Sequence, residues 1–246
     1  MIFFVTGGSR GIGAAIVREA AKAGHDVAFT YRSAEAEANA VRDEARKLNT
    51  SARVLAFPLD VRDSGAVERV GDAVLDELGK VDVMVANAGI NINGLAANLP
   101  DEDWRDVIDT NLSGSFYCAR QFLPQMVKNR FGRLVFVSSM GWTGVSGQVA
   151  YAASKAGLLG LSSTLSKEYG KRGITSNVIV PGFFETDMTS KDMSASNRKF
   201  WLEYCPLGRL GNLDELSELV LFLASKGGGF INGEAIHVTG GLDWAP

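Results

Sequence analysis

The fold of this chain is decided by nine residues near its start, Val5-Thr6-Gly7-Gly8-Ser9-Arg10-Gly11-Ile12-Gly13. A strand-like apolar run, Ile2–Val5, leads into them, and a helical pattern over about Gly13–Ala23 follows. A glycine-rich turn between a strand and a helix lets backbone N–H groups approach a pyrophosphate at the positive end of the helix dipole. This context favours a dinucleotide-binding loop, and an ordinary βα turn is the alternative.

The rest of the chain repeats this alternation of short apolar runs and longer helical patterns. Further strands are expected at Val27–Tyr31, Arg53–Phe57, Val81–Ala86, Leu134–Ser138, Thr175–Val180 and Ala235–Val238. Helices are expected at Ala34–Leu48, Ser64–Leu78, Asp101–Lys128, Tyr151–Arg172 and Leu213–Ala224. Apolar strands that alternate with helices predict right-handed βαβ units. The predicted fold class is therefore α/β, a doubly wound parallel sheet (Rossmann-type) of about seven strands with helices on both faces, in a single domain.

The composition narrows the class of protein. A content of 46% hydrophobic and 22% charged residues is typical of a folded globular chain, and a net charge of −3 does not favour a nucleic-acid binder. Two cysteines and two histidines argue against a disulfide scaffold or a zinc site. No apolar run approaches the ~20 residues that span a bilayer, and no signal pattern is visible. We expect a cytoplasmic enzyme without metal, membrane or nucleic-acid partner.

The end of the second strand indicates which dinucleotide would bind. An acidic residue there would bind the ribose 2′-hydroxyl of NAD. This chain has Arg32 at that position and no carboxylate before Glu35. Arg32 and Arg10 can bind the 2′-phosphate of NADP through charge-assisted hydrogen bonds. NADP(H) is therefore the predicted cofactor, and a solvated surface arginine is the alternative.

A second group of residues has the chemistry of carbonyl reduction. Tyr151 and Lys155 lie four positions apart, which places both side chains on one face of a predicted helix. Ser138 and Ser139 follow an apolar strand at the carboxyl edge of the sheet, where such folds bind ligands. Two hydroxyls and an ammonium can meet there around a carbonyl. Taken alone, the tyrosine and lysine could also be a pair of surface residues.

Together these segments resemble the short-chain dehydrogenase/reductase family. The resemblance runs from Ile2 to Asn232-Gly233-Glu234 and Val238-Thr239-Gly240-Gly241, almost the whole chain. One departure is visible, because the usual Asn-Asn-Ala-Gly reads Ala86-Asn87-Ala88-Gly89. Asn87, the cofactor-side residue, is retained, so we expect a small local effect.

The resemblance implies a site of four catalytic residues, Asn111, Ser138, Tyr151 and Lys155. Ser138 is preferred to Ser139 because its separation from Tyr151 matches the family. Asp60-Val61 resembles the adenine contact, and Pro181-Gly182 with Thr186 resembles the segment that holds the nicotinamide carboxamide. The full set expected to bind NADP(H) is Gly7, Ser9, Arg10, Gly11, Ile12, Gly13, Arg32, Asp60, Val61, Asn87, Ala88, Gly89, Tyr151, Lys155, Pro181, Gly182 and Thr186.

The expected roles follow from charge. A carbonyl that receives hydride develops negative charge on oxygen and needs a proton, which Tyr151 would supply while Ser138 donates a hydrogen bond. A cation about 4 Å away would lower the pKa of Tyr151 towards working pH. Lys155 would be that cation and would also hold the ribose hydroxyls. Asn111 would orient a water that resupplies the proton.

Within the family, Gln148–Gly157 and Pro181–Thr189 look most like β-ketoacyl-[acyl-carrier-protein] reductases. This implies NADPH-dependent reduction of a 3-oxoacyl thioester carried by acyl carrier protein or CoA. A sugar, steroid or polyketide substrate is the first alternative, and a catalytically idle dinucleotide-binding subunit is the second. Basic residues at two helix ends would either dock an acidic carrier protein or offset the helix dipoles: Lys128, Arg130, Arg133, Lys171 and Arg172.

Two expectations concern the surroundings of the site. Residues 183–206 would form a substrate lid insertion or a surface helical hairpin. If the lid closes, the substrate pocket would be lined by Trp142, Gln148, Phe184 and Trp201. Family members are commonly homotetramers joined through the helices that flank the site. The first of these helices offers an apolar face that would serve either this interface or the core: Phe116, Phe122, Leu123 and Met126.

Overall fold

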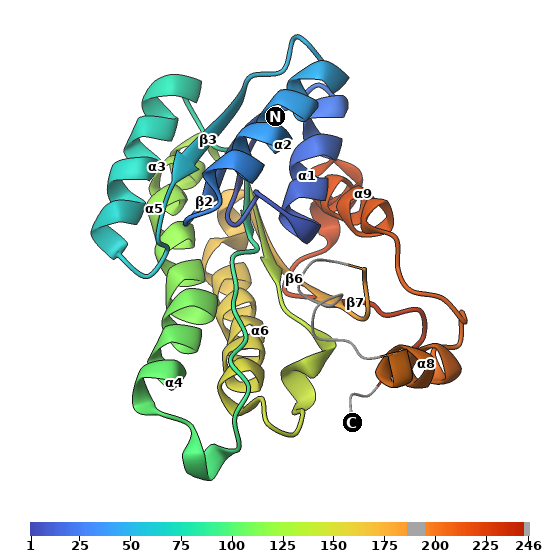
Figure 1. Cartoon of the computed structure of the whole chain (residues 1–246). Helices are drawn as coiled ribbons and strands as arrows, with labels where there is room; N and C mark the ends of the chain where they lie inside the picture. Colours follow the sequence, from blue (N-terminus) through green and yellow to red (C-terminus); the bar gives the residue numbers. More distant parts are fainter. Residues whose placement is uncertain (186–194, 244–246) are drawn as a thin grey trace.

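Seven parallel strands form a single sheet in the computed structural model, which describes residues 1–185 and 195–243 (Figure 1). The strand order is β3-β2-β1-β4-β5-β6-β7, so β1 lies between β2 and β4. The bounds are β1 Ile2–Val5, β2 Asp26–Tyr31, β3 Val54–Pro58, β4 Val83–Ala86, β5 Gly132–Val137, β6 Ile174–Pro181 and β7 Ala235–Val238. The predicted doubly wound parallel sheet is confirmed, with strand ends shifted by one or two residues.

Helices cover both faces of the sheet, as alternating βα units require. On one face lie α3 (Ser64–Leu78), α5 (Gly114–Asn129) and α6 (Val149–Tyr169), packed on a core that includes Phe4, Leu134 and Phe136. On the other lie α1 (Gly11–Lys22), α2 (Glu35–Leu48) and α9 (Leu213–Ala224), packed on Phe3, Val135 and Val137 (Figure 1). Alternate residues of β5 therefore point into different halves of the core.

The helix predicted over Asp101–Lys128 is interrupted. The segment consists of α4 (Asp101–Ile108), a π-helical turn η2 (Asp109–Ser113) and then α5. The Ser115 hydroxyl, in the first turn of α5, donates to the carbonyl of Asn111 at 2.7 Å, and the Ser113 hydroxyl donates to the Asp109 carboxylate at 3.1 Å. Serine side chains compete in this way with the regular helix ladder. Turns of this kind often occur at functional sites, and this one contains Asn111.

Shorter elements complete the connections. They are η1 Ala96–Asn98, η3 Met140–Thr143, η4 Gly170–Arg172, α8 Ala195–Tyr204 and η5 Gly227–Phe230. Part of the predicted lid is thus helical as α8, while residues 186–194, including Thr186, lie outside the described residues. Among the described helices, none combines the length and the apolarity that a membrane span needs.

Candidate active site

The glycine loop joins β1 to the amino end of α1. Gly7 and Gly11 adopt left-handed backbone conformations, with φ of 65° and 55°, which L side chains rarely adopt. Gly13 has no room for a side chain, because an added Cβ would collide with the carbonyl of Gly7 and the carboxamide of Asn87. The helix begins at Gly11, two residues earlier than predicted. The loop therefore brings bare backbone against the amino end of a helix, which is a site for phosphate.

Asn87, just after β4, holds this loop in place. Its side-chain Nδ2 donates to the carbonyls of Thr6 and Gly7 at 2.9 and 3.0 Å. The Thr6 hydroxyl in turn accepts from the backbone N–H groups of Asn87 and Ala88 at 3.0 and 2.9 Å. The ends of two neighbouring strands are thus tied together at the edge where the loop starts.

A cleft of about 250 Å³ runs from the glycine loop along the carboxyl edge of the sheet. Fourteen of the predicted residues line it: Gly7, Ser9, Arg10, Gly11, Ile12, Arg32, Asp60, Val61, Asn87, Ala88, Gly89, Ser138, Tyr151 and Lys155. Asn111, Gly13, Pro181 and Gly182 are not in its wall. Thr110 also lines it and was missed from sequence, although it precedes Asn111. Its buried hydroxyl oxygen has no hydrogen-bond partner among the described residues.

A charged network lies at the Asp60 end of the cleft. The guanidinium of Arg62 binds both carboxylate oxygens of Asp60, at 2.6 to 3.0 Å, and reaches the Asp106 carboxylate of α4 at 2.6 Å. Arg62 accordingly lowers the pKa of Asp60. Arg10 and Arg32 are exposed and form no ion pair within the described part of the chain. Two unpaired cations thus flank this end, and Arg62 was not predicted.

Tyr151 and Lys155 lie on one face of α6. The Lys155 ammonium is 5.6 Å from the centroid of the Tyr151 ring and donates to the carbonyl of Val137 at 2.7 Å. Burial lowers the pKa of Lys155 to about 8. Burial also raises the pKa of Tyr151, and a hydrogen bond with Ser139 only partly offsets this. The expectation that Lys155 lowers the pKa of the phenol is therefore wrong for this structure, because desolvation dominates.

The two strand-end serines point to different partners. The Ser138 hydroxyl is buried and donates to the backbone carbonyl of Lys155 at 2.9 Å. The Ser139 side chain lies near enough to the Tyr151 phenol to lower its pKa, and its hydroxyl accepts from the N–H of Gly141 at 3.1 Å. Ser138 still contributes to the cleft wall. Ser138 thus lines the cleft, as predicted, while Ser139 acts on the pKa of the phenol, and which serine serves the reaction stays a prediction.

Asn111 is buried in the π-helical turn behind the cleft. Its Oδ1 accepts from the N–H of Ile90 at 2.8 Å, and its Nδ2 donates to the carbonyl of Ile90 at 3.0 Å. Nδ2 also donates to the hydroxyl of Ser154 on α6 at 2.9 Å. Three bonds therefore fix its carboxamide close to, but not in, the wall of the cleft.

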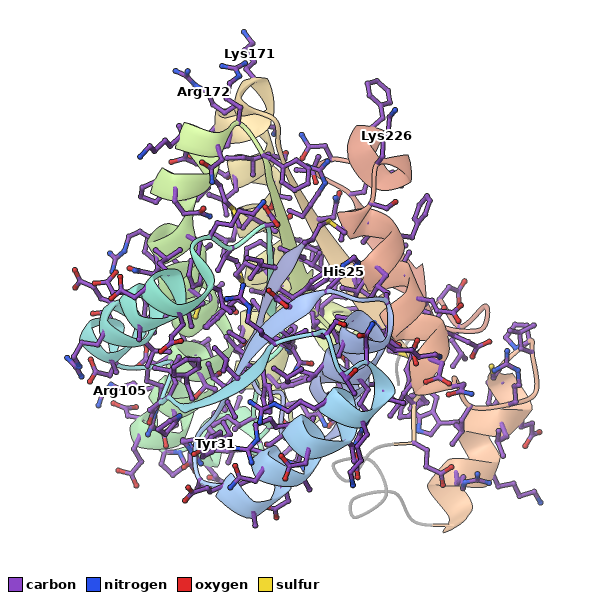
Figure 2. The ribbon with its side chains drawn as sticks, turned by 90° about the horizontal axis from the view of Figure 1, so that it is seen from above. His25, Tyr31, Arg105, Lys171, Arg172 and Lys226 are labelled. Atoms are coloured by element: carbon purple, nitrogen blue, oxygen red, sulfur yellow. The ribbon has the colours of Figure 1, made fainter. Side chains whose placement is uncertain are left out.

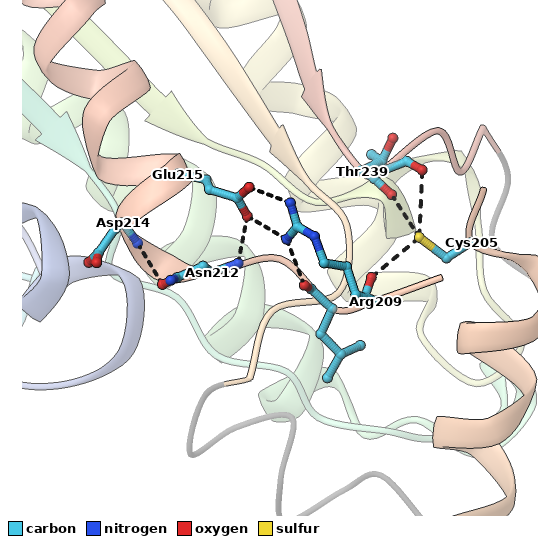
Figure 3. A network of polar contacts seen from close by, with 8 residues as sticks. Cys205, Arg209, Asn212, Asp214, Glu215 and Thr239 are labelled. Carbon is cyan, nitrogen blue, oxygen red and sulfur yellow. Dashed lines mark hydrogen bonds and ion pairs between the residues drawn. The ribbon is translucent and has the colours of Figure 1, made fainter. Parts of the chain in front are cut away.

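A second, smaller cavity of about 110 Å³ lies beside α8 and the carboxyl end of β7. Of the predicted substrate-pocket residues, Phe184 and Trp201 line it, whereas Trp142 and Gln148 do not. Figure 3 shows the polar network beside it, in which Arg209 pairs with Glu215 and lowers the pKa of that carboxyl to about 2. The thiol of Cys205 lies 3.4 Å from the carbonyl of Arg209.

The predicted basic patch lies at the amino ends of β5 and β6, whereas the cleft is at their carboxyl ends. Figure 2 shows Lys171 and Arg172 together at one extremity, with Tyr31 of β2 on the other side of the molecule. Arg133 does not belong to an exposed patch, because it is buried over the Phe131 ring and donates to backbone carbonyls. The exposed cations are Lys128, Arg130, Lys171 and Arg172.

The apolar face of α5 divides between core and surface. Phe122, Leu123 and Met126 are buried in the core of this chain, so the core alternative holds for these three residues. Phe116 is exposed, and the Arg120 guanidinium stacks 5.2 Å from its ring centroid.

Comparisons with known proteins agree with this geometry. The model of a family described as enoyl-(acyl carrier protein) reductase matches residues 7–243. The chain is 43% identical to the 3-oxoacyl-[acyl-carrier-protein] reductase FabG of Escherichia coli (strain K12), over 98% of this chain and 96% of that protein. It is 38% identical to the FabG of Staphylococcus aureus (strain Mu50), over 97% and 96%. The solved structure of levodione reductase superposes with a TM-score of 0.93 at 28% identity, covering 98% of this chain and 96% of that one.

Proposed function

Because the chain belongs to the short-chain dehydrogenase/reductase family, we propose that it reduces a 3-oxoacyl thioester to the 3-hydroxyacyl thioester. The observation that carries this proposal is the placement of Tyr151. Tyr151 lies near Ser139, shares a helix face with Lys155, and lines the cleft that starts at the glycine loop. This set can protonate and hydrogen-bond a carbonyl oxygen. The named relatives make a 3-oxoacyl group a better match than an enoyl group.

The cleft fits an NADP(H) cofactor. Gly7, Gly11 and Gly13 leave a cradle that any Cβ would strain or fill, at the amino end of α1. Arg10 and Arg32 provide unpaired positive charge for a 2′-phosphate, which supports NADP(H) over NAD(H). The remaining cofactor contacts are those predicted above, with Thr110 added. When bound, the reduced nicotinamide supplies the hydride for the carbonyl carbon.

The residues of this chain manage the proton. Because burial raises the pKa of Tyr151, its phenol stays protonated at neutral pH and can act as the acid in reduction. Ser139 would donate a hydrogen bond to the carbonyl oxygen of the substrate, with Ser138 as the alternative donor. Lys155 keeps a positive charge beside the phenol below a pH of about 8. Asn111 would hold the water that returns a proton to the site.

The carrier of the substrate is a further part of the proposal. An acidic acyl carrier protein would bind the exposed cations Lys128, Arg130, Lys171 and Arg172. These lie at the opposite end of β5 from the cleft, a separation of about 20 Å for a six-residue strand. The patch would therefore serve the cleft of another copy within a homotetramer. Charge reversal at Arg130 and Arg172 should raise KM for a carrier-bound substrate and leave a small diketone unaffected.

A turnover screen tests the proposed reaction. Acetoacetyl thioester should drive NADPH oxidation and crotonyl thioester should not, and with NADP⁺ simple secondary alcohols should not be oxidised. Tyr151→Phe should abolish turnover while NADPH binding stays nearly intact, because only the phenolic hydroxyl is removed. Faster turnover of a sugar or steroid ketone would point to the alternative function, a dehydrogenase for that class of substrate. A wild-type protein that binds NADPH but reduces no ketone would refute catalysis.

A further inference from the structure

Ser154 lies between the two halves of the candidate site. It is completely buried on α6, between Tyr151 and Lys155, and its hydroxyl donates to the carbonyl of Tyr151 at 2.7 Å. The same oxygen accepts from Asn111 Nδ2 at 2.9 Å. Among the described residues, this is the only hydrogen bond that joins α6 to the α4–η2–α5 segment.

The direction of these bonds fixes the orientation of the Asn111 carboxamide. A serine hydroxyl has one proton, and Ser154 uses it on the Tyr151 carbonyl, so towards Asn111 it can only accept. The N–H of Ile90 likewise requires an acceptor, which is Oδ1. Ile90 binds both ends of the carboxamide, since its carbonyl accepts from Nδ2 at 3.0 Å, and Ser154 adds the bond that ties Nδ2 to α6.

This orientation matters at Gly89. A Cβ built on Gly89 would lie 3.2 Å from Asn111 Oδ1 and 3.4 Å from the Lys155 ammonium. The amide oxygen and the ammonium thus approach the same point beside the cleft. A carboxamide that moved away from α6 would carry Oδ1 away from this point, where a water could bridge the amide oxygen and the ammonium.

We propose that Ser154 is a positioning residue for the proton supply, which ties the Asn111 carboxamide to α6, the helix of Lys155, by accepting from Asn111 Nδ2. The inference rests on the proposed function, because proton supply matters only if a carbonyl is reduced. It assigns no contact with substrate or cofactor to Ser154.

The test compares Ser154→Ala with Ser162→Ala. Ser162 is a matched control on the same helix, since it is buried and its hydroxyl bonds with that of Ser176 at 2.8 Å, away from the cleft. Ser154→Ala should lower kcat about tenfold and increase its solvent isotope effect, while the Kd for NADPH stays within about twofold. Ser162→Ala should leave kcat and its isotope effect unchanged. Equal loss in both variants, or an unchanged isotope effect in Ser154→Ala, would overturn the proposal.

A second variant and a second measurement keep the outcome decisive. Ser154→Cys is slightly larger and keeps a weak hydrogen-bonding group at this position. Its kcat should therefore fall between wild type and Ser154→Ala, and it replaces the alanine variant if that does not fold. If wild type reduces no ketone, the proposed function fails, and hydrogen exchange of the Asn111 carboxamide still tests the contact. Exchange should be faster in Ser154→Ala than in Ser162→Ala, and equal rates would contradict the assigned contact.

Discussion

Replacing each strand-end serine in turn will show which hydroxyl serves the reaction. Ser139 lies near the phenol of Tyr151 and lowers its pKa, whereas Ser138 donates to the backbone carbonyl of Lys155. Ser139→Ala therefore removes a donor from the reacting group. Ser138→Ala removes a buried bond between β5 and α6 and leaves the phenol with its partner.

The two losses differ in kind and in size. A hydrogen bond to an oxygen that gains charge in the transition state is worth about 10²–10³ in kcat, which is the expected loss for Ser139→Ala. The carbonyl freed by Ser138→Ala keeps its helical N–H partner, so about 0.5–1.5 kcal/mol of stability should be lost. For a chain of 246 residues, a loss of 1 kcal/mol lowers Tm by about 2–4 °C. kcat should fall only a few fold in this variant.

Two measurements on each variant suffice. Steady-state NADPH oxidation with saturating acetoacetyl thioester gives kcat, and thermal unfolding gives Tm. Ser139→Ala should be almost inactive with a Tm near wild type, and Ser138→Ala should be active with a lowered Tm. The reverse pattern, with activity lost in Ser138→Ala and kept in Ser139→Ala, would refute this assignment and restore the serine predicted from sequence.

Three further changes test the rest of the site. Burial lowers the pKa of Lys155 to about 8, so its charge is present below that pH and lost above it; kcat/KM for reduction should fall as pH rises through about 8, and a flat profile would argue against a role for the ammonium. Arg32→Glu should raise the Kd for NADPH about 10–100-fold in a fluorescence titration and affect NADH much less, whereas equal effects would exclude a contact with the 2′-phosphate. Gly13→Ala should abolish NADPH binding and lower the free energy of unfolding by about 1–3 kcal/mol, because its Cβ would collide with the Asn87 side chain. Gly160→Ala, whose Cβ would meet nothing within 4 Å, should change neither quantity.

The order of strands and helices could be predicted because each apolar run is short and bounded by turn residues. The π-helical turn at Asp109–Ser113 could not, since the apolar period continues through it. The turn depends on serine side chains that bond to carbonyl and carboxylate groups one turn away, and such bonds leave no periodic signal in the sequence. Thr110 was missed for the same reason, because its exposure to the cleft follows from the turn.

The choice between the serines shows where spacing alone is insufficient. Separation from Tyr151 favoured Ser138, and strand alternation also places this residue on the side of the sheet that α6 covers. Ser138 continues the side of β5 that carries Leu134 and Phe136, which pack beneath α5 and α6. Its hydroxyl accordingly meets the backbone of α6. The rise in the pKa of Tyr151 could not be predicted from the sequence either, because desolvation depends on which segments enclose the phenol.

The ties that Asn87 makes to Thr6 and Gly7 have a consequence for how the cofactor arrives. A phosphate loop that is floppy when empty must lose conformational entropy on binding, which weakens affinity. Here the chain orders that loop when it folds, through bonds between β1 and β4 that do not involve any ligand. The free enzyme should therefore present a ready-made receptor, and amide protection in this loop should be similar before and after the dinucleotide is added.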